Sequence, residues 1–164
     1  MDFIRLGRDN YLISAETELK DLLDLHELYY LHVDGEIGGL AKAFRGKAKR
    51  PDFLCFVKNS MMAIDAKGGQ DDSDLWVKCD DVLKLDKLHR MTGFPVCLAF
   101  LYRGKWFFIG VQRFLRTHPG GALIDFKEAT KTAYCIESAK CMTLDGTTLL
   151  SLMEKIYSDE VAAL

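Results

Sequence analysis

The sequence predicts an α/β fold in which helices pack on a central β-sheet. Two short apolar runs over residues 53–57 and 61–66 are rich in strand-forming residues and are joined by the polar cluster Lys58-Asn59-Ser60, which predicts a β-hairpin. Farther along, apolar residues at helical spacing over 80–92 precede a continuous apolar run over 95–102, which predicts a helix followed by a buried strand. Strand and helix patterns that alternate in this way are typical of α/β proteins.

Composition predicts one globular domain over residues 1–164. The 164 residues are 49% hydrophobic and 28% charged, which is enough for an adequate core. The net charge of −2 means that affinity for nucleic acid has to come from local clusters of Lys and Arg. The five cysteines form no Cys-x-x-Cys pair, which favours a reduced, intracellular protein, either cytoplasmic or nucleoid-associated. Because no segment is long and apolar enough to span a bilayer, we expect no membrane partner.

The elements ahead of the hairpin are expected to be a helix and a strand. Ser14 is a plausible N-cap, and Leu19, Leu22 and Leu23 follow helical spacing, so a helix is predicted near 15–28. A strand is expected near 29–33, and the segment between it and the hairpin is a loop rich in Gly, Lys and Arg.

The elements after the hairpin are predicted from the same patterns. A charged loop is expected over 68–77, a tight turn at Arg103-Gly104 joins strands near 95–102 and 105–111, and a closing helix is expected over Thr147–Tyr157. Residues 112–118 suit either a short helix or an extended segment. A further short strand is expected near 134–136.

The hairpin is expected to bring two carboxylates and a lysine together. In an antiparallel pair, positions equidistant from the turn lie opposite one another, so Asp52 comes close to Asp65. Side chains alternate between the two faces of a strand, so Asp65 and Lys67 project to one side, while Ala66 points away and leaves its carbonyl oxygen as a further ligand.

This arrangement is suited to a hard metal ion and to phosphate chemistry. Two converging carboxylates repel each other unless they share a proton or bind a cation. An all-oxygen site favours Mg²⁺, with Mn²⁺ as a substitute, because nothing here offers the imidazole and thiolate ligands that zinc prefers. A neighbouring lysine can orient a metal-bound water and offset charge on a phosphate. Phosphodiester hydrolysis is the chemistry that these residues favour.

Pro51-Asp52 followed by Asp65-Ala66-Lys67 resembles the motif of the PD-(D/E)XK nuclease superfamily. The segment Ala15-Glu16-Thr17-Glu18-Leu19 is also similar to the N-terminal helix of archaeal Holliday-junction resolvases. The resemblance covers a core of about 14–111, which leaves 112–164 as a C-terminal elaboration. It implies a restriction-endonuclease-like fold with a mixed central sheet flanked by helices.

The same resemblance implies a magnesium-dependent DNA endonuclease, either structure-selective, as resolvases are, or of a restriction or repair type. Asp52 and Asp65 would be metal ligands, Glu16 would complete the metal site, and Lys67 would position the attacking water. Because resolvases of this superfamily are dimeric, a homodimer is a further expectation.

Accessory residues are expected on both sides of the motif. Glu18 is the reserve candidate for the role of Glu16, and Lys78 and Lys84 are candidates for a supporting lysine from the following helix. Five basic residues lie in a nine-residue stretch that contains no acid and ends just before Asp52, and they are expected to hold backbone phosphates. They are Lys42, Arg45, Lys47, Lys49 and Arg50.

Two other interpretations remain open from the sequence. One is a nuclease-fold module that binds nucleic acid or protein without cutting it. The other is a globular protein in which Asp52 and Asp65 flank a turn and pair with Lys67 or Arg50. No base-reading motif stands out, so the sequence leaves open the choice between DNA and RNA.

Overall fold

The computed structural model describes residues 15–33, 48–68, 75–117, 123–125 and 132–163. Its strands are β1 (Tyr30–His32), β2 (Phe53–Val57), β3 (Ser60–Lys67), β4 (Leu75–Lys78), β5 (Val96–Tyr102), β6 (Lys105–Gly110), β7 (Leu123–Asp125) and β8 (Thr132–Ile136). Its helices are residues 15–25, α3 (Cys79–Thr92), α4 (Val111–Thr117) and α5 (Leu149–Ala162), with a 3₁₀ turn at Ser138–Lys140.

The main sheet has five strands in the order β1-β2-β3-β5-β6, and it is mixed. β3 lies at its centre, antiparallel to β2 and parallel to β5, while the remaining pairs are antiparallel. A parallel neighbour requires the chain to cross over the sheet, and α3 lies in that crossover between β3 and β5. A second sheet has the order β4-β8-β7.

Two tight turns set the register of the antiparallel pairs. Lys58 and Asn59 both have positive φ angles, of 51° and 59°, and they form a two-residue connection between β2 and β3. Arg103 and Gly104 do the same between β5 and β6, with φ angles of 49° and 72°. Two positive φ angles define the type I′ turn, whose twist matches that of paired strands.

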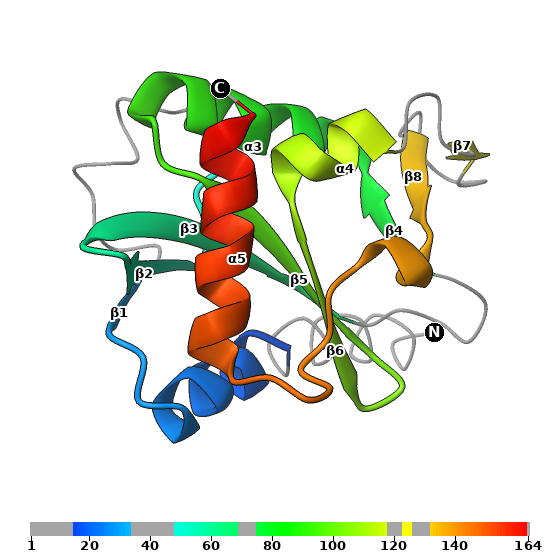
Figure 1. The fold of residues 1–164 in the computed structure, drawn as a ribbon. Helices are drawn as coiled ribbons and strands as arrows, with labels where there is room; N and C mark the ends of the chain where they lie inside the picture. Colours follow the sequence, from blue (N-terminus) through cyan, green and yellow to red (C-terminus); the bar gives the residue numbers. More distant parts are fainter. Residues whose placement is uncertain (1–14, 34–47, 69–74, 118–122, 126–131, 164) are drawn as a thin grey trace.

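The sheet is covered on both faces by separate apolar clusters. On one face, side chains of β2 and β3 such as Phe53 and Ile64 pack against Leu19, Leu23 and residues of α5. On the other, residues such as Ala63 and Leu98 pack against α3, α4 and the small sheet. Figure 1 shows α5 in red across the first face with the helix of residues 15–25 in blue near its lower end. Because β3 is covered on both faces, its side chains are buried almost throughout.

Helix α3 packs against the face toward which the predicted site residues point. Its first turn carries Asp80 and Asp81, where the helix dipole favours negative charge. The helix ends at Gly93, whose left-handed φ of 73° lets its N–H donate to the His89 carbonyl. Its buried residues Val82, Leu85 and Leu88 lie against the sheet.

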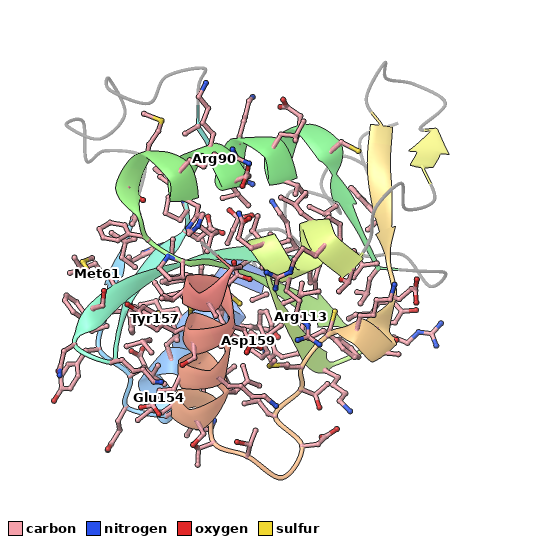
Figure 2. The ribbon with its side chains drawn as sticks, turned by 45° about the horizontal axis from the view of Figure 1, so that its top comes forward. Met61, Arg90, Arg113, Glu154, Tyr157 and Asp159 are labelled. Carbon is pink, nitrogen blue, oxygen red and sulfur yellow. The ribbon has the colours of Figure 1, made fainter. Side chains whose placement is uncertain are left out.

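Helices α4 and α5 are joined by a buried carboxylate. Glu160 of α5 is fully buried, and its two oxygens accept hydrogen bonds from the backbone N–H groups of Gln112 and Arg113 at the start of α4, at 2.9 and 3.1 Å. Burial raises the pKa of Glu160, although these two N–H groups oppose the shift. Beside it, Arg113 forms an ion pair with Asp159 at 3.6 Å, and Figure 2 shows these two side chains where α4 meets α5.

The expected fold class is confirmed, with one local difference. The helix near the N-terminus, the hairpin, the next helix and the two strands after it all form where the sequence predicts them. The segment 68–77 was expected to be a charged loop, but β4 begins within it at Leu75 and pairs with β8. Ser14 lies outside the described residues. In the described part of the chain, no helix is long and apolar enough to cross a membrane.

Candidate metal-binding and catalytic site

The hairpin brings Asp52 and Asp65 together, as the sequence predicts. In the β2–β3 register Phe53 pairs with Ile64, which places Asp52 and Asp65 next to one another at the end of the ladder. The Oδ2 atom of Asp52 accepts a hydrogen bond of 2.7 Å from the N–H of Ala66. Alternation along β3 directs Asp65 and Lys67 to the face of α3, whereas Ile64 and Ala66 contact the opposite core.

Asp52 has a strongly perturbed acidity. Its pKa is raised from 3.8 to about 7, mainly by burial and also by the negative charges of Asp65 and Glu16, although the Ala66 N–H opposes the shift. A carboxyl group with this pKa is poised between its two charge states at neutral pH. Such groups concentrate at functional sites, and a bound cation would favour the ionised form of Asp52.

The raised pKa of Asp52 predicts an unusual pH dependence of stability. The folded state holds a proton that the unfolded state releases near pH 4, so stability is fully present below pH 4 and falls as the pH rises through about 7. We expect Asp52→Asn to stabilise the metal-free protein at pH 8 by about 2–4 kcal/mol, and to have little effect at pH 4. Urea denaturation of both proteins at the two pH values measures this. If the free energies of unfolding of the wild type and Asp52→Asn changed in parallel from pH 4 to 8, this prediction would be wrong.

Asp65 is the most deeply buried group of the site. Its side chain is 1% exposed, its Oδ2 atom lies 2.6 Å from Lys67 Nζ and 3.1 Å from Lys49 Nζ, and its buried Oδ1 atom has no hydrogen-bond partner. A buried oxygen without a partner is costly. Its cost would be offset by a cation at Oδ1, so the orphaned atom is consistent with a metal ligand.

The two carboxylates are enough to bind Mg²⁺ together with waters and phosphate oxygens, but they cannot surround the ion with protein ligands alone. Among the described residues, no group of three or more His, Cys, Asp or Glu side chains is arranged to hold a metal ion. Mg²⁺ in phosphoryl-transfer sites is bound by one or two carboxylates and otherwise by waters and phosphate oxygens. Asp52 and Asp65 supply that number.

Lys67 lies between two carboxylates. Its Nζ atom is 2.6 Å from Asp65 Oδ2 and 2.9 Å from Asp81 Oδ2 of α3. Lys49 approaches the same two oxygens, each at 3.1 Å. Burial alone would lower the pKa of Lys67, but Asp65 and Asp81 outweigh it and hold that pKa above its usual value. Lys67 is therefore a protonated, firmly oriented ammonium group, suited to contacting anionic oxygen and unsuited to accepting a proton.

Glu16 lies at the margin of this group. Its carboxylate contributes to the raised pKa of Asp52, and its Oε1 atom lies 2.6 Å from Nε2 of His32 in β1. The His32 ring stacks on Phe53 with centroids 4.9 Å apart, so the ring is held in place. Glu18, the reserve candidate, is exposed on the same helix.

Of the basic and accessory residues that the sequence predicts, only one lies within the site among those that the structure describes. Lys49 belongs to the site through its ion pairs, and Arg50 is exposed beside it. Lys84 pairs with Asp80 at 2.8 Å on the exposed side of α3, and Lys78 is exposed just before that helix. Lys42, Arg45 and Lys47 lie outside the described residues.

Asp81 and the inward position of Lys49 are not among the features that the sequence predicts. Asp81 lies four and seven residues before the buried Leu85 and Leu88, and this spacing places it on the buried face of α3. The spacing was therefore a usable signal. Its neighbour Asp80 has no such relation and is exposed.

Comparison with known proteins supports the fold. No protein-family model and no curated protein matches the chain. Among solved structures, the chain is similar to Hjc of Archaeoglobus fulgidus, a Holliday junction resolvase from an archaeal hyperthermophile, with a TM-score of 0.50 and 16% identity over 81% of this chain and 91% of that one. It is also similar to D212, a nuclease from a fusselovirus, with a TM-score of 0.48 and 14% identity over 97% of both chains. At these identities the likeness is one of fold.

Proposed function

We propose that this chain, which has the restriction-endonuclease-like fold of the PD-(D/E)XK nucleases, is a metal-dependent DNA endonuclease. The observation that carries the proposal is the convergence of Asp52 and Asp65 beside the buried ammonium of Lys67. A sheet hairpin that combines two carboxylates, one with an unpartnered buried oxygen, with a fixed positive charge is suited to phosphodiester hydrolysis.

Asp52 and Asp65 would hold Mg²⁺, or Mn²⁺ in its place, with Glu16 supporting the site from the N-terminal helix. When bound there, the metal would supply Lewis acidity toward a phosphate oxygen and would lower the pKa of a bound water. Glu16 lies near enough to Asp52 to affect its pKa, and His32 holds its side chain. Ala66 anchors Asp52 through its N–H, which fixes the carboxylate at the end of the hairpin.

Lys67 would act on the reacting phosphate as a fixed positive charge. Its ammonium group remains protonated, so its contribution is to orient the attacking water and to offset the negative charge that develops on phosphate oxygens. An ammonium group has three N–H donors, and two carboxylate partners occupy only two of them. One proton can therefore contact substrate while the others hold Asp65 and Asp81.

DNA is the proposed partner, held by the basic residues that precede Asp52, with Arg50 exposed at the end of that stretch. We further propose that the protein acts as a homodimer on particular DNA structures. The likeness to a junction resolvase favours this assignment, and cutting both strands of a junction needs two sites. This finer assignment belongs to the same proposal and is tested with it.

The test is cleavage of labelled duplex, single-stranded, flapped and four-way-junction DNA by the wild type and by Asp52→Asn. With Mg²⁺ or Mn²⁺ the wild type should cut at least one substrate, EDTA should abolish the cutting, and Asp52→Asn should reduce it by about a hundredfold or more. The substrate that is cut fastest then identifies the preferred structure.

Two results would count against the enzyme. Cleavage that persists in EDTA would exclude the metal assignment. If the wild type binds DNA but cuts no substrate with either metal, the chain is a binding module with a nuclease fold, because binding then survives without the chemistry.

A further inference from the structure

Asp81 is the one carboxylate of the ion-pair ring that the proposed mechanism does not use. The ring consists of Lys67, Lys49, Asp65 and Asp81, in which each ammonium contacts the Oδ2 atoms of both carboxylates within 2.6–3.1 Å. Two positive and two negative charges therefore balance. The side chain of Asp81 is 26% exposed, so it lies at the outer rim of the ring, whereas Asp65 lies at its base.

The position of Asp81 is set by the packing of α3. The next residue, Val82, is fully buried, and Leu85 one turn later is buried in the same core as Ala63 and Leu98 of the sheet. This packing holds the backbone of Asp81 beside Lys67. The two lysines attract Asp81 strongly enough that its pKa lies below its usual value in spite of burial, so Asp81 is a fixed negative charge.

A bound cation would affect the ion pairs of the two carboxylates differently. A metal ion at Asp65 would draw electron density from that carboxylate and repel the adjacent ammonium groups, which weakens the contacts of Lys67 and Lys49 with Asp65. A lysine released from its partner regains rotamer freedom, which disfavours a single orientation. Asp81 is not a proposed metal ligand, so its contacts with both ammonium groups at 2.9 and 3.1 Å remain.

On this basis, and resting on the proposed nuclease function, we propose that Asp81 is a positioning residue that holds Lys67 and Lys49 beside the metal-binding carboxylates. Two ammonium groups, rather than one, would then meet the reacting phosphate. Under this proposal Lys49 acts at the reacting phosphate, in addition to the binding of DNA backbone phosphates that the sequence predicts for it.

The chain offers a matched control on the same helical turn. Asp80 is adjacent to Asp81, carries the same charge, and forms an ion pair with Lys84 on the exposed side of α3. Asp81→Asn and Asp80→Asn therefore remove the same charge from neighbouring positions. Only the first variant removes a carboxylate from the ring.

The first measurement is an NMR spectrum of the lysine ammonium groups in protein labelled with ¹⁵N-lysine, before and after addition of Mg²⁺. Ammonium protons are visible when ion pairing slows their exchange with water. Lys67 should give a signal in the wild type and in Asp80→Asn with Mg²⁺ present, and should lose it in Asp81→Asn. This readout needs no cleavage, so it stays informative if the proposed function fails.

The second measurement separates turnover from substrate binding. Asp81→Asn should lower kcat by about tenfold to one-hundredfold, the cost of a misplaced group, with KM changed by less than about threefold. Asp81→Glu, which keeps the carboxylate, should recover part of the loss, and Asp80→Asn should match the wild type. Should Asp81→Asn fail to fold, Asp81→Ser replaces it, with the same expected loss of kcat and of the Lys67 signal.

Each outcome decides the proposal. A Lys67 signal that persists in Asp81→Asn with Mg²⁺, or a kcat equal to that of the wild type, overturns the positioning role. If the wild type itself cuts no DNA, the nuclease assignment fails, and the ammonium signal alone then decides whether Asp81 fixes Lys67.

Discussion

Replacement of Lys67 by methionine should lower kcat for DNA cleavage by about a thousandfold, with DNA affinity retained within about threefold. Methionine keeps most of the apolar stem but removes the ammonium group that contacts Asp65 and Asp81. The loss is expected to be large because this charge is preorganised. Its side chain is only 12% exposed, so little solvent screens it.

The matched control for this variant is Lys105→Met, which removes the same group from an exposed ion pair with Asp145 outside the proposed site. It should cut DNA at the rate of the wild type. Single-turnover cleavage with saturating enzyme, at a temperature well below unfolding, measures the chemical step, and a DNA-binding titration in EDTA measures affinity. Equal cleavage by Lys67→Met and the wild type would remove Lys67 from the mechanism.

Gly110→Ala is expected to have the largest effect on stability, a loss of about 2–4 kcal/mol and a fall in Tm of about 5–15 °C. An added methyl group would overlap the side chain of Glu160. That carboxylate is fully buried and holds the N–H groups of Gln112 and Arg113. If it moves, two backbone donors lose their acceptor.

A double-mutant cycle identifies the cause of this loss. Glu160→Ala removes the overlapping atoms, so adding Gly110→Ala to it should cost little beyond the effect of Glu160→Ala alone. Thermal and urea unfolding of the two single variants and the double variant provide the numbers. Strictly additive losses would show that the overlap is not the source of the instability.

The sequence predicts the hairpin site well because its geometry is local. Asp52 and Asp65 are joined by a short chain with a turn signal at Lys58 and Asn59, so alternation and register suffice to bring them together. The mixed sheet and the helix before β5 follow from patterns of the same kind, and the fold class is confirmed. Whether the gathered residues act as metal ligands and catalytic groups stays a prediction.

The features that were missed depend on contacts between distant segments. Asp81 meets Lys67 only because α3 packs on β3, and Lys49 reaches the same oxygens from a loop with no periodic pattern. Trp76 in β4 pairs with Cys135 across a long stretch of chain, and nothing near Trp76 indicates that partner. Glu160 follows the buried Met153 and Ile156 by seven and four residues. That spacing indicates a buried carboxylate but not the backbone groups that it binds.

The two-residue connection at Lys58 and Asn59 limits how this protein can change in length. A residue added to that connection either lengthens the turn or shifts β3 by one position against β2, and a shift of one exchanges the two faces of the strand. After such a shift, Asp65 and Lys67 would enter the apolar core between the sheet and α5, while Ile64 and Ala66 would face α3. Insertions and deletions should therefore be tolerated between other elements but selected against here, where the placement of Asp65 and Lys67 and the packing of the core depend on the same residue count.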